Sequence, residues 1–211
     1  MGTISKGILG GFSGTVGTVI GGSWKGIAYM RSQPGKRSFT PSEKQLAQQA
    51  RFALVMRFLQ PMSALLEVTF RSFGVRMTGI NSALSYNIQN AVTGTYPTLS
   101  IDYALALVSR GDLPNALSPA VTAGAGGILT FSWTDNSGSG IASSTDLAVA
   151  VAYCPALQQA VYDIGSSRGD MTADLNASVF AGQQVETWIS FVTQDGKKSA
   201  TSIFTGEVTV S

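Results

Sequence analysis

The spacing of apolar residues divides the chain into segments of different expected structure. Up to about residue 33, small and β-branched residues alternate with a period of two, which predicts a glycine-rich β arm. From Ser23 onward this pattern predicts one strand with two faces, which carry Trp24, Gly26, Ala28 and Met30 on one side and Lys25, Ile27, Tyr29 and Arg31 on the other. PGKRS, at residues 34–38, predicts a turn or linker.

The next segment predicts a helix. Thr40-Pro41-Ser42-Glu43 combines an N-cap residue, a proline at the first helical position and a capping-box glutamate. Apolar residues follow at helical spacing, namely Leu46, Ala47, Ala50, Leu54, Val55, Phe58 and Leu59. Pro61 ends or kinks this helix, and residues 62–73 and 82–92 predict two shorter helical segments.

Short β-type runs predominate after residue 97. The predicted strands are residues 99–108, 128–134, 147–153, 159–163, 175–180, 186–193 and 199–210, with a hairpin turn at Asp195-Gly196. This pattern, with Trp133 on an early strand, resembles an immunoglobulin or fibronectin type III sandwich, although no disulfide pair is present. We therefore expect an α+β protein, with the arm and helices in residues 1–96 and a β-sandwich in residues 97–211.

Charged residues are few and unevenly distributed. They make up 12% of the chain, about half of the usual share, which suggests that much of the surface is covered by something else. Residues 1–76 hold ten Lys or Arg and two acidic residues (net +8), whereas the remainder holds four basic and ten acidic residues (net −6). Because the basic residues are spread over the arm and a helix, we favour contact between opposite halves of neighbouring subunits and expect no nucleic-acid partner.

The residues that usually carry catalysis are scarce. There is no histidine, and the single Cys154 lies in the apolar run AVAVAYCPAL, which predicts a buried structural thiol. The commonest base and nucleophile pairings are therefore missing, so we expect no enzyme activity, catalytic residue or cofactor. MGTISKGILGG is not typical of a Sec signal peptide, and no segment approaches the ~20 apolar residues that would span a membrane.

Three binding patterns occur in incomplete form. The arm glycines lie three or four residues apart and lack the lysine and hydroxyl order of a phosphate-binding loop. Small-xxx-small pairs in the same segment would suit a membrane zipper, but glycine disfavours a helix there. The run from Asp135 to Asp146 imitates a calcium loop, but it offers serine hydroxyls as ligands and is flanked by strands, so we expect no metal site. For the glycine-rich arm, the remaining interpretation is an extended backbone that approaches another backbone closely.

Three blocks of sequence carry a family resemblance. They are KGILGGFSGTVGTVIGGSWKGIAYMRSQP, TPSEKQLAQQARFALVMRFLQPM and the closing QDGKKSATSIFTGEVTV. Together they resemble an uncharacterised family of Bacteroidota proteins known only as a domain of unknown function. The resemblance spans nearly the whole chain and implies a bacterial source, or a phage of such bacteria. It also implies the order of arm, helix and β domain, and it supplies no catalytic residues.

These observations lead to three functional hypotheses. The first is a non-catalytic structural subunit that self-assembles into a homopolymer, as a filament, sheath or virion component, and whose location would be an extracellular assembly or a virion. Its interface residues would lie in the arm and are Gly10, Gly14, Gly17, Gly21, Trp24, Ile27, Tyr29 and Arg31. The second is a monomeric binding or adhesion module whose sandwich loops, at residues 135–145 and 165–174, contact a glycan or a protein. The third uses the basic half to contact nucleic acid. The arm could also pair within its own chain and complete its own domain.

Overall fold

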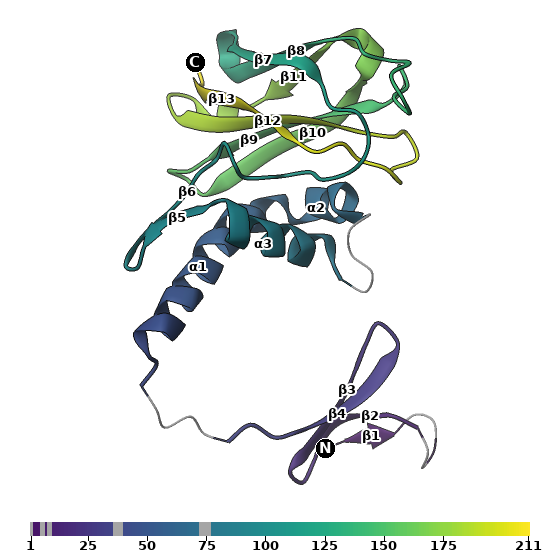
Figure 1. Cartoon of the computed structure of the whole chain (residues 1–211), viewed down its shortest axis with the longest axis vertical. Helices are drawn as coiled ribbons and strands as arrows, with labels where there is room; N and C mark the ends of the chain where they lie inside the picture. The colour runs from purple at the N-terminus through teal and green to yellow at the C-terminus, as the bar shows by residue number, and fades with distance from the viewer. Residues whose placement is uncertain (1, 5–6, 8–9, 36–39, 72–76) are drawn as a thin grey trace. The chain divides into compact units, whose positions relative to one another are not determined.

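A computed structural model describes residues 2–4, 7, 10–35, 40–71 and 77–211. Its contacts divide the chain into two compact units, Met1–Ser42 and Glu43–Ser211. The regular structure among the described residues of the first unit consists of strands, and the second unit contains helices and antiparallel sheets (Figure 1). The predicted α+β class is therefore confirmed.

The arm is a four-stranded antiparallel sheet. Its strands are β1 (Thr3–Ile4), β2 (Phe12–Val16), β3 (Val19–Trp24) and β4 (Ile27–Ser32), in the order β1-β2-β3-β4. The single strand predicted from Ser23 onward is wrong. Lys25 and Gly26 both have positive φ, as a two-residue type I′ turn requires, and Trp24 pairs directly with Ile27. The alternation of side chains cannot reveal this turn, because the same alternation continues in the strand before the turn and in the strand after it.

The predicted helices are present with small changes in their limits. They are α1 (Glu43–Leu59), the 3₁₀ turn η1 (Gln60–Met62), α2 (Ser63–Thr69) and α3 (Gly79–Asn90). Pro61 separates α1 from α2, as expected. Thr78 caps α3, since its hydroxyl accepts a hydrogen bond from the Asn81 N–H at 3.4 Å. The end of the segment predicted at residues 62–73 lies outside the described residues.

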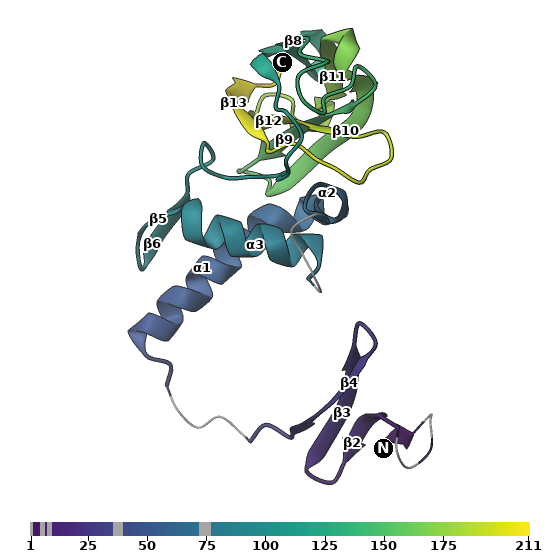
Figure 2. The same cartoon turned by 45° about the vertical axis from the view of Figure 1, so that its right-hand side comes forward.

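Two larger sheets and one hairpin make up the β structure of the second unit. The hairpin of β5 (Val92–Thr95) and β6 (Thr98–Ile101) contacts α1 (Figure 2). The larger sheets have the orders β10-β9-β12-β13 and β11-β8-β7. Their strands are β7 (Leu117–Ala123), β8 (Ile128–Thr134), β9 (Leu147–Cys154), β10 (Gln159–Ser167), β11 (Thr172–Asn176), β12 (Gln184–Val192) and β13 (Ile203–Thr209).

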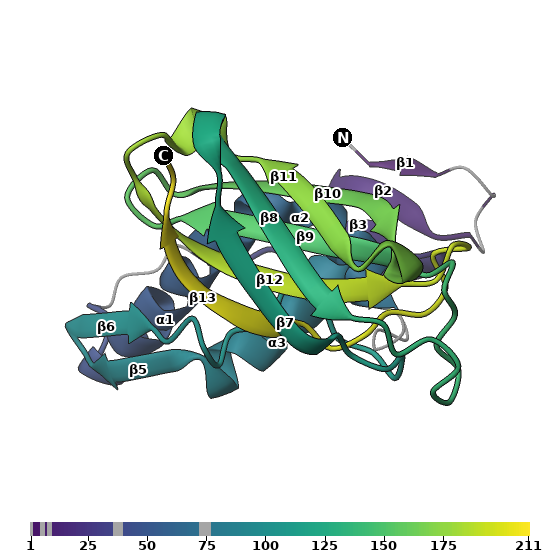
Figure 3. The same cartoon turned by 90° about the horizontal axis from the view of Figure 1, so that it is seen from above.

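These elements stack in three layers. The two sheets lie face to face, as the view from above shows (Figure 3), and one buried cluster joins Phe131 and Leu175 of one sheet to Ala150 and Ile189 of the other. The helices cover the opposite face of the sheet β10-β9-β12-β13 (Figure 1). Cys154 is buried in the cluster between the sheets, which confirms the prediction of a buried thiol.

Three strand predictions need correction. Strand β7 was missed because Pro119 interrupts its pattern; Pro119 falls in a register shift, and β7 is an edge strand, where proline is tolerated. The strand predicted at 99–108 ends at Ile101. The apolar residues beyond it fill the space between helices and sheet, where Ala106 and Val108 are buried. The strand predicted at 175–180 ends at Asn176, whose side-chain oxygen accepts a hydrogen bond from the Ser178 N–H.

The helices and the sheet β10-β9-β12-β13 share a second core. Phe58 of α1 packs edge to face on Tyr153 of β9 and lies against Trp188 of β12. The Trp188 Nε1–H donates to the Ala106 carbonyl at 3.1 Å. The Ser199 hydroxyl donates to the Thr69 carbonyl at 2.9 Å, which ties α2 to the approach to β13. The expected boundary at residue 96 thus falls inside the compact unit Glu43–Ser211, and independent folding of residues 97–211 stays a prediction.

One helical stretch, Glu43–Thr69, is long and apolar enough to span a membrane by length and composition alone. Core helices of soluble proteins meet the same criterion. Here Phe58, Leu59 and Leu66 are completely buried in the core shared with the sheet. The expectation of no membrane span stays a prediction.

Candidate functional site

The register of the arm assigns its side chains to two faces. Directly paired residues lie on the same side of a sheet, so Trp24 joins Ile27, and Gly22 joins Tyr29. We call the side that carries Ile20, Trp24, Ile27, Tyr29 and Arg31 the tryptophan face. The opposite side, which we call the valine face, carries Ile4, Phe12, Val16, Val19 and Met30. The valine face is therefore mostly apolar, whereas the tryptophan face combines four large apolar side chains with the polar residues Thr3, Ser13, Thr15 and Arg31.

Neither face is covered by a second layer within the arm itself. Of the strand residues in the arm, only Gly21 is buried. On the tryptophan face Trp24 is 55% exposed, and on the valine face Val16 is 55% and Met30 71% exposed. A sheet normally buries at least one apolar face against a second layer, and exposed apolar patches mark interaction sites. The arm therefore has two candidate contact surfaces.

The four predicted interface glycines have roles inside the arm. Gly14 and Gly17 have positive φ, a conformation that other residues adopt only with strain. Gly21 lies under the Phe12 ring and carbonyl, where a side chain would collide. Gly10 lies at the bend before β2, and its N–H donates to the Gly7 carbonyl. A substitution at these glycines would distort the arm itself, so the side chains of the two faces are the better test of an interface.

The predicted interface residues with side chains come together on one face. Trp24, Ile27, Tyr29 and Arg31 all belong to the tryptophan face, although the single-strand prediction had separated Trp24 from the other three. No large side chain of the valine face is among the predicted interface residues. Its signal was present in the apolar residues Val16 and Val19, which the two-residue turn between β2 and β3 pairs with each other.

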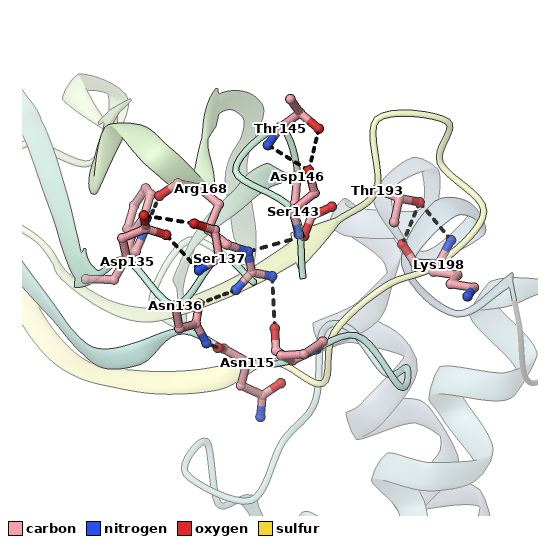
Figure 4. Close-up of polar contacts among 12 residues, drawn as sticks. Asn115, Asp135, Asn136, Ser137, Ser143, Thr145, Asp146, Arg168, Thr193 and Lys198 are labelled. Carbon is pink, nitrogen blue, oxygen red and sulfur yellow. Dashed lines mark hydrogen bonds and ion pairs between the residues drawn. The ribbon is translucent and has the colours of Figure 1, made fainter. Parts of the chain in front are cut away.

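A second candidate site is an open cleft of about 630 Å³ at one end of the paired sheets. It lies between the loop that joins β8 to β9 and the loop that joins β12 to β13 (Figure 4). Its lining is mostly polar and consists of Ile141, Ser143, Thr145, Asp146, Thr193, Gln194, Asp195, Lys197 and Lys198. Of the two loops predicted to bind a ligand, the first contributes to this cleft and the second does not.

The turn between β12 and β13 forms one wall of the cleft. Gly196 has a positive φ, and the Thr193 hydroxyl donates to Asp195 Oδ1 at 2.7 Å. This bond, with those from Lys197, holds the pKa of the Asp195 carboxyl well below its usual range. Asp195 also forms an exposed ion pair with Lys197 at 3.0 Å. The hairpin predicted at Asp195-Gly196 is present, but its loop is longer than the predicted two residues, because the Thr193 N–H donates to the Lys198 carbonyl at 2.9 Å and four residues lie between them.

A fully buried arginine holds the loops behind the cleft. The Arg168 guanidinium donates from Nε to Asp146 Oδ2 at 3.2 Å, from Nη1 to Asn136 Oδ1 at 2.6 Å and from Nη2 to the Pro114 carbonyl at 2.9 Å (Figure 4). It also lies over the Phe191 ring, 3.8 Å from the centroid. Burial lowers the pKa of the guanidinium, and the charge of Asp146 opposes this shift.

This network also shows how the segment that imitates a calcium loop is arranged. Asp146 is directed to Arg168 and to the Ser143 N–H. Asp135 accepts hydrogen bonds from the N–H and hydroxyl of Ser137. Among the described residues, no three acidic or cysteine side chains come together as metal ligands would. Arg168 was not singled out from the sequence; its signal was that only four basic residues follow residue 76.

The family comparison agrees with the resemblance carried by the three sequence blocks. A family of unknown function, DUF6266, matches residues 11–206. The chain belongs to this family. The match covers the arm, the helices and nearly all of the β structure, and the bacterial or phage source stays a prediction. Comparison with curated proteins and comparison with solved structures each gave no match.

Proposed function

We propose that this member of DUF6266 is a non-catalytic structural subunit that self-assembles into a homopolymer through its N-terminal arm. A filament, a sheath or a virion component fits such a subunit. The observation that carries the proposal is the exposure of two apolar faces on one thin sheet. One apolar face could be satisfied by a single closed dimer, whereas two faces require cover on both sides, and contacts through two surfaces can propagate.

The distribution of buried residues supports the proposal. The described buried apolar residues lie between Val55 and Val210, so the second unit has its own core without the arm. The arm, by contrast, holds apolar side chains that no other residue of the arm covers. The low charge of the whole chain and its basic N-terminal half are further features expected of a subunit whose surface meets other copies.

Deletion of residues 1–33 tests the proposal. We expect residues 34–211 to stay folded by circular dichroism and to be monomeric by size-exclusion chromatography with light scattering, while the full chain assembles. A full chain that stays a 22.0 kDa monomer at high concentration, or a deletion that still assembles, would contradict the proposal. A deletion that misfolds would indicate that the arm completes its own domain.

Substitutions on single faces sharpen the test. Trp24→Asp places a charge on the tryptophan face, and Met30→Asp places one on the valine face. Because each leaves the other face intact, we expect small closed oligomers from each variant and monomers from the double variant. Val179→Asp is the matched control, since Val179 is an exposed apolar residue of the other unit and 67% exposed. It should assemble like the original chain.

We also infer that the strands from Leu117 to Thr209 form an immunoglobulin or fibronectin type III-like sandwich. In the lettering of those domains β7 to β13 become A, B, C, C′, E, F and G. The sheets are then E-B-A and a G-F-C sheet whose fourth strand, β10, lies beside C, as in variable-type domains. An experimental structure in which β10 pairs with β11 instead would contradict this inference.

The loop cleft favours a second candidate function, a monomeric binding module. Its polar lining and volume suit a glycan or a segment of another protein. Lys198→Ala together with Thr145→Ala would remove two lining side chains without touching Arg168. If the full chain is monomeric and binds a glycan through this cleft, the double variant should lose that binding and keep its unfolding midpoint.

A further inference from the structure

We propose that the free edge of β10 accepts strand β4 from the arm of a second copy of this chain. This inference rests on the proposed function and identifies the surface that the arm contacts. The arm offers a free strand and a positive charge, and the β10 edge offers unpaired backbone and a negative charge.

The acceptor is a groove between two sheet edges. Strand β10 ends the order of one sheet and β11 ends the order of the other, so each has one side without a paired strand. A groove of about 580 Å³ lies between them, lined by Ala160 to Asp163 of β10 and Asp174 to Asn176 of β11. Unpaired strand edges of this kind can be extended by a strand from another chain.

The groove is acidic. Asp163 and Asp174 line it, and both are exposed. Asp174 accepts a hydrogen bond from the Thr130 hydroxyl at 2.7 Å, whereas the carboxylate of Asp163 has no partner among the described residues. No lysine or arginine lines the groove. A positive side chain on an incoming strand would therefore pair with Asp163.

Strand β4 has the matching features. It is the last strand of the arm sheet, and all six of its residues, Ile27–Ser32, are exposed. Residues 1–42 contain five lysines or arginines, Arg31 among them, and no acidic residue that could pair with Arg31 within the arm. The continuous paired run of β10, from Gln159 to Ile164, is also six residues long.

The alternation of side chains agrees with this pairing. Val161 packs toward the space between the two sheets, and Asp163, two residues on, lies on the same side of β10. With Arg31 beside Asp163, Tyr29 would lie on that side too, beside Val161 or Gly165 according to strand direction. The pairing would thus cover the edge and part of the tryptophan face.

A charge exchange in the full chain tests the pairing. We expect Asp163→Arg and Arg31→Asp to slow assembly at low salt by about tenfold or more each, measured by light scattering, because each places like charges together. The double variant R31D/D163R should recover most of the original rate. Glu207→Arg is the matched control, since Glu207 is exposed on β13 at the other edge of the same sheet. It should not slow assembly.

Unchanged assembly of Asp163→Arg would overturn the inference, because Asp163 would then only protect the edge from pairing. Failure of the double variant to recover would also overturn it. If deletion of residues 1–33 abolishes assembly while Asp163→Arg does not, the proposed function stands and the arm contacts another surface. If the full chain never assembles, both fail.

A crosslink distinguishes pairing between chains from pairing within one chain. Arg31→Cys in a tagged chain and Asp163→Cys in an untagged chain should form a disulfide between the two when they are mixed and oxidised, while the native Cys154 is buried. A disulfide that forms only within a single chain carrying both substitutions would contradict a second copy as the partner.

Discussion

The arm and the unit Glu43–Ser211 use similar apolar residues in opposite ways. In the second unit, phenylalanine, tryptophan and leucine side chains fill two clusters, one on each face of the sheet β10-β9-β12-β13. In the arm, Trp24, Ile27 and Met30 are more than half exposed, although their backbone forms regular paired strands. Regular hydrogen bonding is thus present in both units, and burial is present in only one.

This difference shows that strand pairing and core formation are separate requirements. Hydrogen bonds contribute only about 1 kcal/mol each to stability, because the unfolded chain bonds to water instead. Burial of apolar surface is the larger favourable contribution, and the arm by itself buries little of it. A contact that covers the arm would therefore strengthen both the contact and the arm fold.

The same substitution in the two units gives the largest contrast. Trp188→Ala removes a completely buried ring and its hydrogen bond to Ala106, and we expect a loss of about 4 kcal/mol in the free energy of unfolding. Trp24→Ala should leave the urea midpoint unchanged, followed by circular dichroism below the concentration at which the chain assembles. Similar losses from both variants would show that the arm is part of the cooperative core.

The buried ion pair gives a contrast between the interior and the surface. Arg168→Ala leaves Asp146 buried without its cation, and we expect a loss of about 3 kcal/mol in the free energy of unfolding. Lys197→Ala removes the exposed pair with Asp195 and should leave the midpoint unchanged. The double variant R168M/D146N should recover part of the loss. An Arg168→Ala variant as stable as the original chain would refute this role.

The smallest expected effect is a gain in the free energy of unfolding, not a loss. Glu186 pairs directly with Glu207 across two strands, and burial, followed by the charge of Glu207, raises the pKa of Glu186. The folded state then holds this proton more tightly than the unfolded state, so stability is present below the ordinary pKa of 4.5 and is lost as pH rises through the folded value.

Glu186→Gln should therefore raise the free energy of unfolding at pH 7 by about 0.5 kcal/mol, and the gain should disappear near pH 3.5. Urea unfolding at the two pH values measures the difference. Glu67→Gln, on the exposed side of α2, is the control and should change nothing at either pH. A Gln variant that is less stable at pH 7 would show that the ionised carboxylate is favourable in the fold.

Elements with a local signal were predictable from the sequence. Pro61 separates two helices because a proline removes a backbone donor wherever it stands. Strand β8 coincides with the predicted residues 128–134, since its alternation has one face in the core. Gly196 adopts the positive φ that the Asp-Gly turn predicted. In each case the cause lies within a few residues of its effect.

Elements that depend on distant partners were not predictable. The apolar run that ends at Val108 looks like a strand, yet it lies between helices and sheet, which come together only in the folded unit. Strand β7 is allowed its proline only because it lies at a sheet edge. In the sequence Arg168 looks like an ordinary surface cation. Only the folded structure shows that Asp146, 22 positions away, is its buried partner.

The two faces of the arm depend on both the local sequence pattern and the pairing of strands. The sequence by itself determined that residues 10–32 would be extended, rich in glycine and apolar at alternate positions, because these are properties of each residue and its neighbours. Only the tertiary structure decided that Lys25 and Gly26 form a turn and that Trp24 therefore lies beside Ile27 and on the same side as Arg31. The composition of a face depends on which strands pair, and an alternating period alone does not specify where one strand ends and the next begins.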